Sequence, residues 1–73
     1  MADFAFRAVI GRNSEPVKVH ITLGGVDRGF TPTEKNEALN VELGSGTYSW
    51  VARRNGEIVA RGESAGGQIK IIL

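Results

Sequence analysis

The sequence predicts an all-β protein, a single domain of residues 1–73 arranged as a small antiparallel two-sheet β-sandwich with about six to seven short strands. Two observations predict this class. Apolar and polar residues alternate with a period of two in several short segments, which is typical of strands that bury one face. In addition, ten glycines are spread at turn-like intervals along the chain, as expected for short strands joined by tight turns.

The first two predicted strands are residues 4–10 and 17–23, each with one apolar side. The residues expected to point inward are Phe4, Phe6, Ala8 and Ile10 in the first, and Val17, Val19, Ile21 and Leu23 in the second. Between them, residues 11–16 are turn formers, and Pro16 has no amide hydrogen for a central strand. After the second strand, the glycines of residues 24–29 predict that the chain turns.

The middle of the chain carries one signal for helix initiation. Thr31 offers an N-cap hydroxyl, Pro32 suits the first helical position, and Glu34 is placed to close a capping box. Because the apolar residues of a full helix do not follow, we expect at most one helical turn, from Pro32 to Asn36. The next strand, residues 38–43, is expected to send Leu39, Val41 and Leu43 inward.

A hairpin is predicted about the dipeptide Asn55-Gly56, between strands at residues 47–54 and 57–63. Of the two loop lengths compared, a three-residue loop opposes Trp50 with Ala60 and Ala52 with Ile58, and separates apolar from charged residues. This register predicts an inner face of Tyr48, Trp50, Ala52, Ile58 and Ala60. The last strand, residues 68–73, follows Gly66-Gly67 and is expected to send Ile69, Ile71 and Leu73 inward.

The outer face of this hairpin is the predicted interface, made of Val51, Arg53, Val59 and Arg61. β-Branched side chains flanked by arginines suit a protein contact. The alternative is an ordinary surface, where scattered apolar residues are normal. For Tyr48 and Trp50, burial in the small core is favoured over an exposed platform for sugars or bases.

The central stretch resembles the PEGA domain and, more broadly, transthyretin-like (prealbumin-like) and carboxypeptidase-regulatory-like β-sandwiches, which have an Ig-like architecture. The matching elements are the strand and turn at residues 21–25, Gly29-Phe30-Thr31-Pro32, and residues 43–50 with Gly-x-Tyr-x-Trp chemistry around Tyr48. The run of polar residues at 33–38 is longer than the family pattern. The resemblance implies a sandwich used for binding, spacing or assembly, and it brings no catalytic residues.

Composition argues against several function classes. Nine Lys and Arg against eight Asp and Glu leave the chain nearly neutral, whereas nucleic-acid binders usually carry a clustered basic excess. Without cysteine there is neither a disulfide nor a zinc thiolate. The single histidine, His20, lies on the polar side of its strand without evident partners for catalysis or metal binding. We therefore expect no enzymatic activity, no cofactor and no metal.

The leading hypothesis is a non-enzymatic structural or protein-interaction module that binds a protein partner or forms a homo-oligomer, either alone or within a surface or multidomain protein. One alternative is a carbohydrate- or nucleic-acid-binding module that uses Trp50 or the arginines Arg7, Arg12, Arg53, Arg54 and Arg61. Another is a small viral or phage assembly protein. No signal peptide or membrane segment is visible, so we expect a cytoplasmic protein if the chain is full length and an extracytoplasmic one if it is an excised domain.

Overall fold

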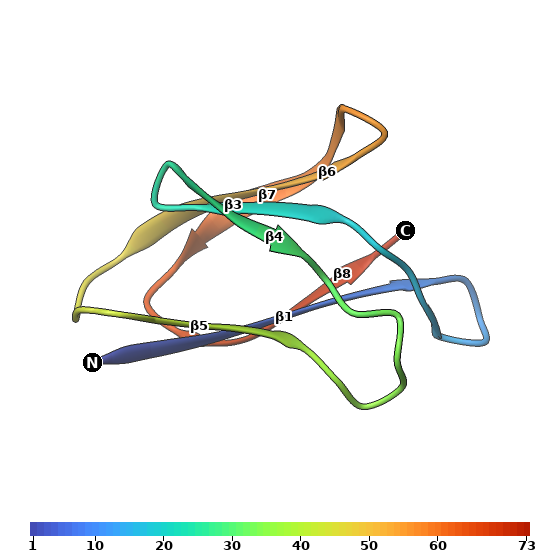
Figure 1. Ribbon diagram of the computed structural model, residues 1–73, viewed down its shortest axis with the longest axis horizontal. Helices are drawn as coiled ribbons and strands as arrows, with labels where there is room; N and C mark the ends of the chain where they lie inside the picture. The colour runs from blue at the N-terminus through green and yellow to red at the C-terminus, as the bar shows by residue number, and fades with distance from the viewer.

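The computed structural model describes residues 1–73 and shows two four-stranded sheets packed face to face, with no helix. Figure 1 shows the sheet of β3, β4, β6 and β7 lying above the sheet of β1, β5 and β8. The strands are β1 (Ala2–Ile10), β2 (Glu15–Pro16), β3 (His20–Leu23), β4 (Val26–Phe30), β5 (Leu39–Leu43), β6 (Tyr48–Arg54), β7 (Glu57–Ser64) and β8 (Gly67–Ile72). The predicted all-β, two-sheet sandwich is thus confirmed.

In the first sheet, β1 is the central strand. Residues Phe4–Phe6 of β1 pair with both β5 and β8, and Val9 pairs with both β2 and β8. Since a strand has two edges, β8 occupies one edge of β1, while β5 and β2 share the other. The β1–β8 pair is parallel, unlike the antiparallel pairs that the sequence predicts. A parallel pair needs a long connection, and here almost the entire chain connects the two strands.

The second sheet has the order β4-β3-β6-β7, and all its pairs are antiparallel. Its β3–β4 hairpin occupies a stretch where the sequence predicts only a turn. Gly24 and Gly25 have φ angles of 63° and 78°, so they form the two-residue loop with positive φ that joins twisted strands well. Chain reversal at this dipeptide lets residues 26–30 pair with β3.

The chain changes sheets between β2 and β3. The Val17 amide donates to the Ala8 carbonyl of the first sheet at 3.0 Å, whereas pairing with the second sheet begins at His20. Residues 17–19 are therefore a corner and not the first half of one long strand. Val19 is nevertheless buried as predicted, and Val17 is half-buried.

Thr31 connects this corner to the end of β4. Its side-chain oxygen Oγ1 donates to the Val17 carbonyl at 2.8 Å and accepts from the Val19 amide at 3.0 Å, while the Thr31 amide donates to the Val19 carbonyl at 2.9 Å. Thr31 is 2% exposed. Its hydroxyl therefore provides hydrogen-bond partners for the backbone of the corner and does not cap a helix. Residues 34–37 form only a turn, with the Glu37 amide 3.4 Å from the Glu34 carbonyl.

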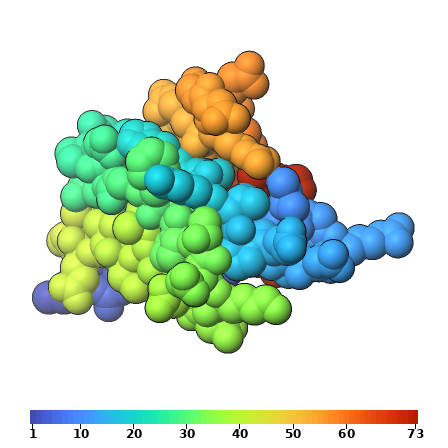
Figure 2. Space-filling view, turned by 45° about the vertical axis from the view of Figure 1, so that its right-hand side comes forward, coloured from blue at the N-terminus to red at the C-terminus, as the bar shows by residue number.

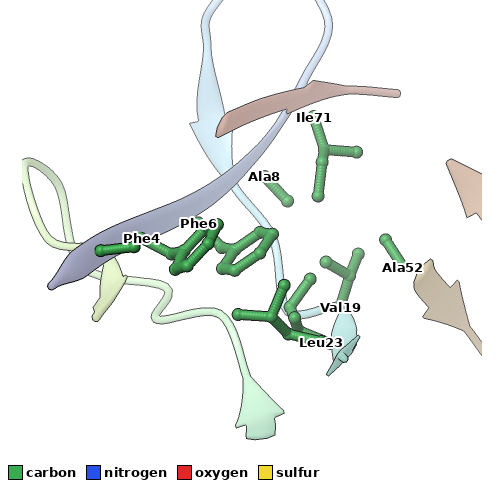
Figure 3. Close-up of a cluster of buried hydrophobic side chains, with 9 residues drawn as sticks. Phe4, Phe6, Ala8, Val19, Leu23, Ala52 and Ile71 are labelled. Atoms are coloured by element: carbon green, nitrogen blue, oxygen red, sulfur yellow. The ribbon is translucent and has the colours of Figure 1, made fainter. Parts of the chain in front are cut away.

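The core lies between the sheets and combines inward residues of β1, β3, β6 and β8 (Figure 3). Its members are Ala2, Phe4, Phe6, Ala8, Val19, Ile21, Leu23, Ala52 and Ile71. The predicted inward residues of residues 38–43 and 68–73 pack against this cluster, most of them half-buried. Alternation therefore assigns the buried side of these strands correctly.

The β6–β7 hairpin differs from its predicted register. Arg54 opposes Glu57, so the loop is the two residues Asn55 and Gly56, with φ angles of 53° and 83°. A β-bulge then shifts the pairing by one residue, and Ala52 opposes Ala60. Because the bulge lies within the strand, the hairpin keeps the favoured two-residue turn and still separates its apolar face from its charged face.

The predicted position of Ile58 is accordingly wrong. Ile58 opposes Arg53 and is 52% exposed, whereas the prediction placed it on the inner face opposite Ala52. Tyr48, Trp50 and Ala60 do pack against the core, with Gly62 opposite Trp50.

Candidate functional site

Two rows of side chains cross the outer face of the second sheet. Residues directly opposite one another in antiparallel strands point to the same side, so the register defines each row. From β4 to β7, the first row contains Phe30, His20, Arg53 and Ile58. The second row contains Asp27, Thr22, Val51 and Arg61. We call the surface formed by these two rows the outer face.

Large apolar side chains occupy both ends of the first row. Phe30 is 51% exposed and Ile58 is 52% exposed. The Lys18 ammonium nitrogen lies 4.3 Å from the centroid of the Phe30 ring, and the His20 ring centroid lies 5.1 Å from it. A cation at this distance is attracted to the aromatic face. The phenyl ring is therefore held at the surface by polar neighbours and is not covered by them.

A close contact between His20 and Asp27 joins the two rows. His20 Nε2 lies 2.6 Å from Asp27 Oδ1, which also accepts the Gly29 amide hydrogen at 2.9 Å. The Gly29 hydrogen bond, with a further contribution from His20, lowers the pKa of the Asp27 carboxyl below its ordinary value. A bulge in the β3–β4 pair lies beside this contact. His20 is thus held by Asp27 on the open surface of the sheet.

Arginines form the middle of the outer face. Arg53 Nη1 lies 3.5 Å from Thr22 Oγ1, a long contact that leaves most of the guanidinium donors free. Beside it, an open hollow of about 570 Å³ reaches the Asn55-Gly56 turn. In Figure 2 this hairpin, in orange, rises above the second sheet. The charged and aromatic residues that line the hollow are Lys18, His20, Phe30, Arg53 and Arg54. No carboxylate is among its lining residues, so positively charged side chains predominate there.

The structure brings the four predicted interface residues together on β6 and β7. Val51 lies directly opposite Arg61, Arg53 lies in the neighbouring row, and Val59 is at the bulge. Val59 is 38% exposed, whereas Val51 and Arg53 are half-buried. Val51 therefore contributes less apolar surface than its position in the alternating pattern suggests.

The interface residues predicted from the sequence did not include Phe30, Ile58 and Lys18, which supply much of the apolar and cationic character of the outer face. Phe30 was missed because its strand was predicted as a turn. The signal was available, since a Gly-Gly pair between two extended segments is typical of a hairpin. Nothing local in the sequence indicates that Ile58 faces outward, because the bulge reverses the expected alternation.

The large aromatics of β6 lie between the sheets. The Trp50 ring centroid is 5.9 Å from that of Phe6, and the Tyr48 ring centroid is 5.8 Å from that of Phe4, both edge to face. The Tyr48 hydroxyl donates to the Gly44 carbonyl at 2.8 Å. Trp50 is therefore a packing residue of the sandwich, and the aromatic ring available on the outer face is that of Phe30.

No group of three or more His, Cys, Asp or Glu side chains is arranged to hold a metal ion. The structure also contains no helix with the length and apolar character needed to cross a membrane.

Comparison with known proteins gives no relative from which a role can be transferred. The chain matches no protein-family model, no curated protein and no solved structure. The outer face itself therefore carries the information on function.

Proposed function

We propose that this chain is a non-enzymatic protein-interaction module that binds its partner through the outer face of the β4-β3-β6-β7 sheet. The observation that carries the proposal is the exposure of Phe30, Ile58 and Val59 on a single sheet, beside Arg53 and Arg61. Aromatic and arginine side chains are enriched at protein interfaces, where they account for much of the binding energy.

The size of the surface supports this role. A standard protein interface buries about 800 Å² on each partner, and the molecule exposes 4711 Å² in total. One sheet face of a small sandwich provides an area of this order. The PEGA-like elements around Gly29-Phe30-Thr31-Pro32 and Tyr48 point toward the same kind of role, because such sandwiches serve in binding and assembly.

The chemistry of the outer face indicates what it binds. Phe30 offers an apolar contact, and the Lys18, Arg53 and Arg54 side chains surround it with positive charge. The complementary surface is a partner segment with an apolar anchor flanked by Asp or Glu side chains. Paired arginine and carboxylate groups would orient that segment, while the apolar anchor displaces water from the phenyl ring.

The test measures binding of a synthetic peptide with one Leu or Phe flanked by Asp and Glu, using amide shifts and isothermal titration. We expect saturable shifts at residues of the two rows, and at least about a fivefold loss of affinity in Phe30→Ser, since an interface anchor contributes more than about 1 kcal/mol. The matched control is Ile72→Ser, because Ile72 is 71% exposed but lies on β8 of the other sheet.

Two outcomes would count against the proposal. Equal losses in Phe30→Ser and Ile72→Ser would show that the outer face is not the binding surface. Tighter binding of a single-stranded oligonucleotide, with stacking on Phe30, would instead favour the nucleic-acid alternative. A second copy of the chain is tested by light scattering, where loss of an oligomer in Ile58→Ser would identify the partner as the protein itself.

A further inference from the structure

A second polar hollow lies on the side of the first sheet that faces away from the second sheet. It is thus on the opposite side of the sandwich from the outer face, the proposed interaction surface. β5 pairs with β1 up to Phe6 and β2 pairs with it from Val9, so the strand edge between them has no partner strand. Residues 34–37 turn past this gap. In Figure 2 this turn, in green, lies near the light-blue loop of residues 11–14 at the lower right. The missing strand thus leaves room beside Arg7.

The hollow has a volume of about 550 Å³ and a mostly polar lining. Its polar residues are Arg7, Asn36, Glu37, Asn40, Gln68 and Lys70. A smaller hollow of about 230 Å³ adjoins it, since Arg7, Asn36 and Lys70 line both. Lys35 lines the smaller one. The two hollows together form one depression with Arg7 and Lys70 at its centre.

Arg7 and Lys70 are positive charges held side by side without a direct ion-pair partner. They oppose one another directly in the parallel β1–β8 pair, where like charges repel. The only acid–base contact within ion-pair distance joins His20 and Asp27 on the other sheet. Thus neither Glu34 nor Glu37 forms a direct ion pair with these cations, although both line the depression. An anion placed between Arg7 and Lys70 would relieve this repulsion.

The remaining lining restricts the class of ligand. A guanidinium fork beside an ammonium group suits a phosphate, which accepts several charge-assisted hydrogen bonds. The amides of Asn36 and Gln68 both donate and accept hydrogen bonds, and the Glu37 carboxylate accepts them, which suits hydroxyl groups. No aromatic side chain lines either hollow, so a stacked nucleobase has no support. The larger volume also exceeds that of a single ion.

We propose that this depression binds a phosphorylated sugar or polyol, with the phosphate between Arg7 and Lys70 and the hydroxyl groups toward Asn36, Glu37 and Gln68. The site is independent of the proposed protein interface, because the two occupy opposite outer faces of the sandwich. Failure of one proposal therefore leaves the other standing.

The test is an amide-shift titration of the full chain with glucose 6-phosphate, glucose and inorganic phosphate, each up to about 10 mM, the range of weak small-molecule binding. Glucose 6-phosphate is expected to give saturable shifts at Arg7, Asn36 and Lys70, and to bind more tightly than either fragment. Raising the salt concentration should weaken it. Equal affinity for glucose, or for inorganic phosphate alone, would overturn the assignment to a phosphorylated sugar. No saturable shift at these amides would overturn the site itself.

Variants separate the role of the two cations. Arg7→Gln and Lys70→Gln should each weaken glucose 6-phosphate binding about tenfold, the expected loss of a charge-assisted hydrogen bond. Arg7→Lys keeps the charge but not the fork, and should give an intermediate loss. Lys18→Gln removes the same charge from the other face and should change nothing. Equal effects of Lys18→Gln and Lys70→Gln would show a general charge effect and contradict the proposal. Thermal unfolding of each variant verifies that it is folded.

Discussion

Replacing Thr31 with valine removes the hydroxyl that joins the corner of the chain to the end of β4. Valine has nearly the same shape, so the packing around the side chain is largely retained. The change therefore acts on two hydrogen bonds, to the Val17 carbonyl at 2.8 Å and from the Val19 amide at 3.0 Å. Because Thr31 is 2% exposed, water cannot readily replace the lost hydroxyl.

The magnitude follows from the two backbone groups that lose their partner. A buried polar group left without a hydrogen bond costs about 1–3 kcal/mol. The Val19 carbonyl still accepts the Thr31 amide, so it is unaffected. We expect Thr31→Val to lower the free energy of unfolding by about 2–6 kcal/mol. The whole domain of 73 residues should have a stability of only about 4–11 kcal/mol, so the loss is a large share of it.

Urea denaturation followed by Trp50 fluorescence measures this effect. With a slope of about 1 kcal/mol per molar urea for a small domain, the midpoint should fall by about 2 M or more. Thr31→Ser retains the hydroxyl and should cost only about 1 kcal/mol for the lost methyl group. Thr33→Val is the matched control, since Thr33 is exposed and makes no side-chain hydrogen bond.

A specific result would refute the reasoning. If Thr31→Val and Thr31→Ser destabilise the protein equally, the hydroxyl contributes nothing beyond shape and the corner is stabilised by packing alone. A loss of less than about 0.5 kcal/mol, the size of an ordinary surface effect, would have the same meaning. If Thr31→Val is unfolded even without urea, while Thr31→Ser is folded, the reasoning is supported.

Two further predictions concern the β6–β7 hairpin and the contact between Asp27 and His20. A β-carbon added at Gly62 would meet the Trp50 ring at 3.1 Å. Gly62→Ala should therefore shift the indole, change its emission maximum and lower the free energy of unfolding by about 1 kcal/mol. The control is Gly44→Ala, where the nearest contact of an added β-carbon is 3.8 Å and the emission should stay unchanged. Because the pKa of Asp27 is lowered in the folded state, its contribution to stability is present above the ordinary value of 3.8 and is lost as pH falls through the lower folded value. Asp27→Asn should therefore flatten the acid limb of the stability curve in urea titrations between about pH 2 and 5, and an unchanged slope would contradict this.

Several features of this molecule were determined by the sequence alone. Alternation with a period of two identified which side of β3, β5, β8 and most of β1 is buried, because burial of every second residue is a local property of an extended chain. The exception is the end of β1, where Val9 is 4% exposed and Ile10, expected inward, is only half-buried. The same reasoning predicted that one face of the hairpin carries Val51, Arg53, Val59 and Arg61. It placed Trp50 inside as well, since so small a core needs its largest side chains.

Tertiary structure decided the remaining features. The parallel pairing of β1 with β8 joins the two ends of the chain, and no local pattern encodes a partner that far away. The bulge near Val59 places Ile58 on the outward side of β7. It allows the preferred two-residue Asn55-Gly56 turn at the end of the hairpin while Ala60, further along the strand, still faces the core. Likewise, Thr31 became a corner residue because the chain changes sheets opposite it. Local patterns fix which side of a strand is apolar, but strand partners and sheet changes depend on packing between segments distant in sequence.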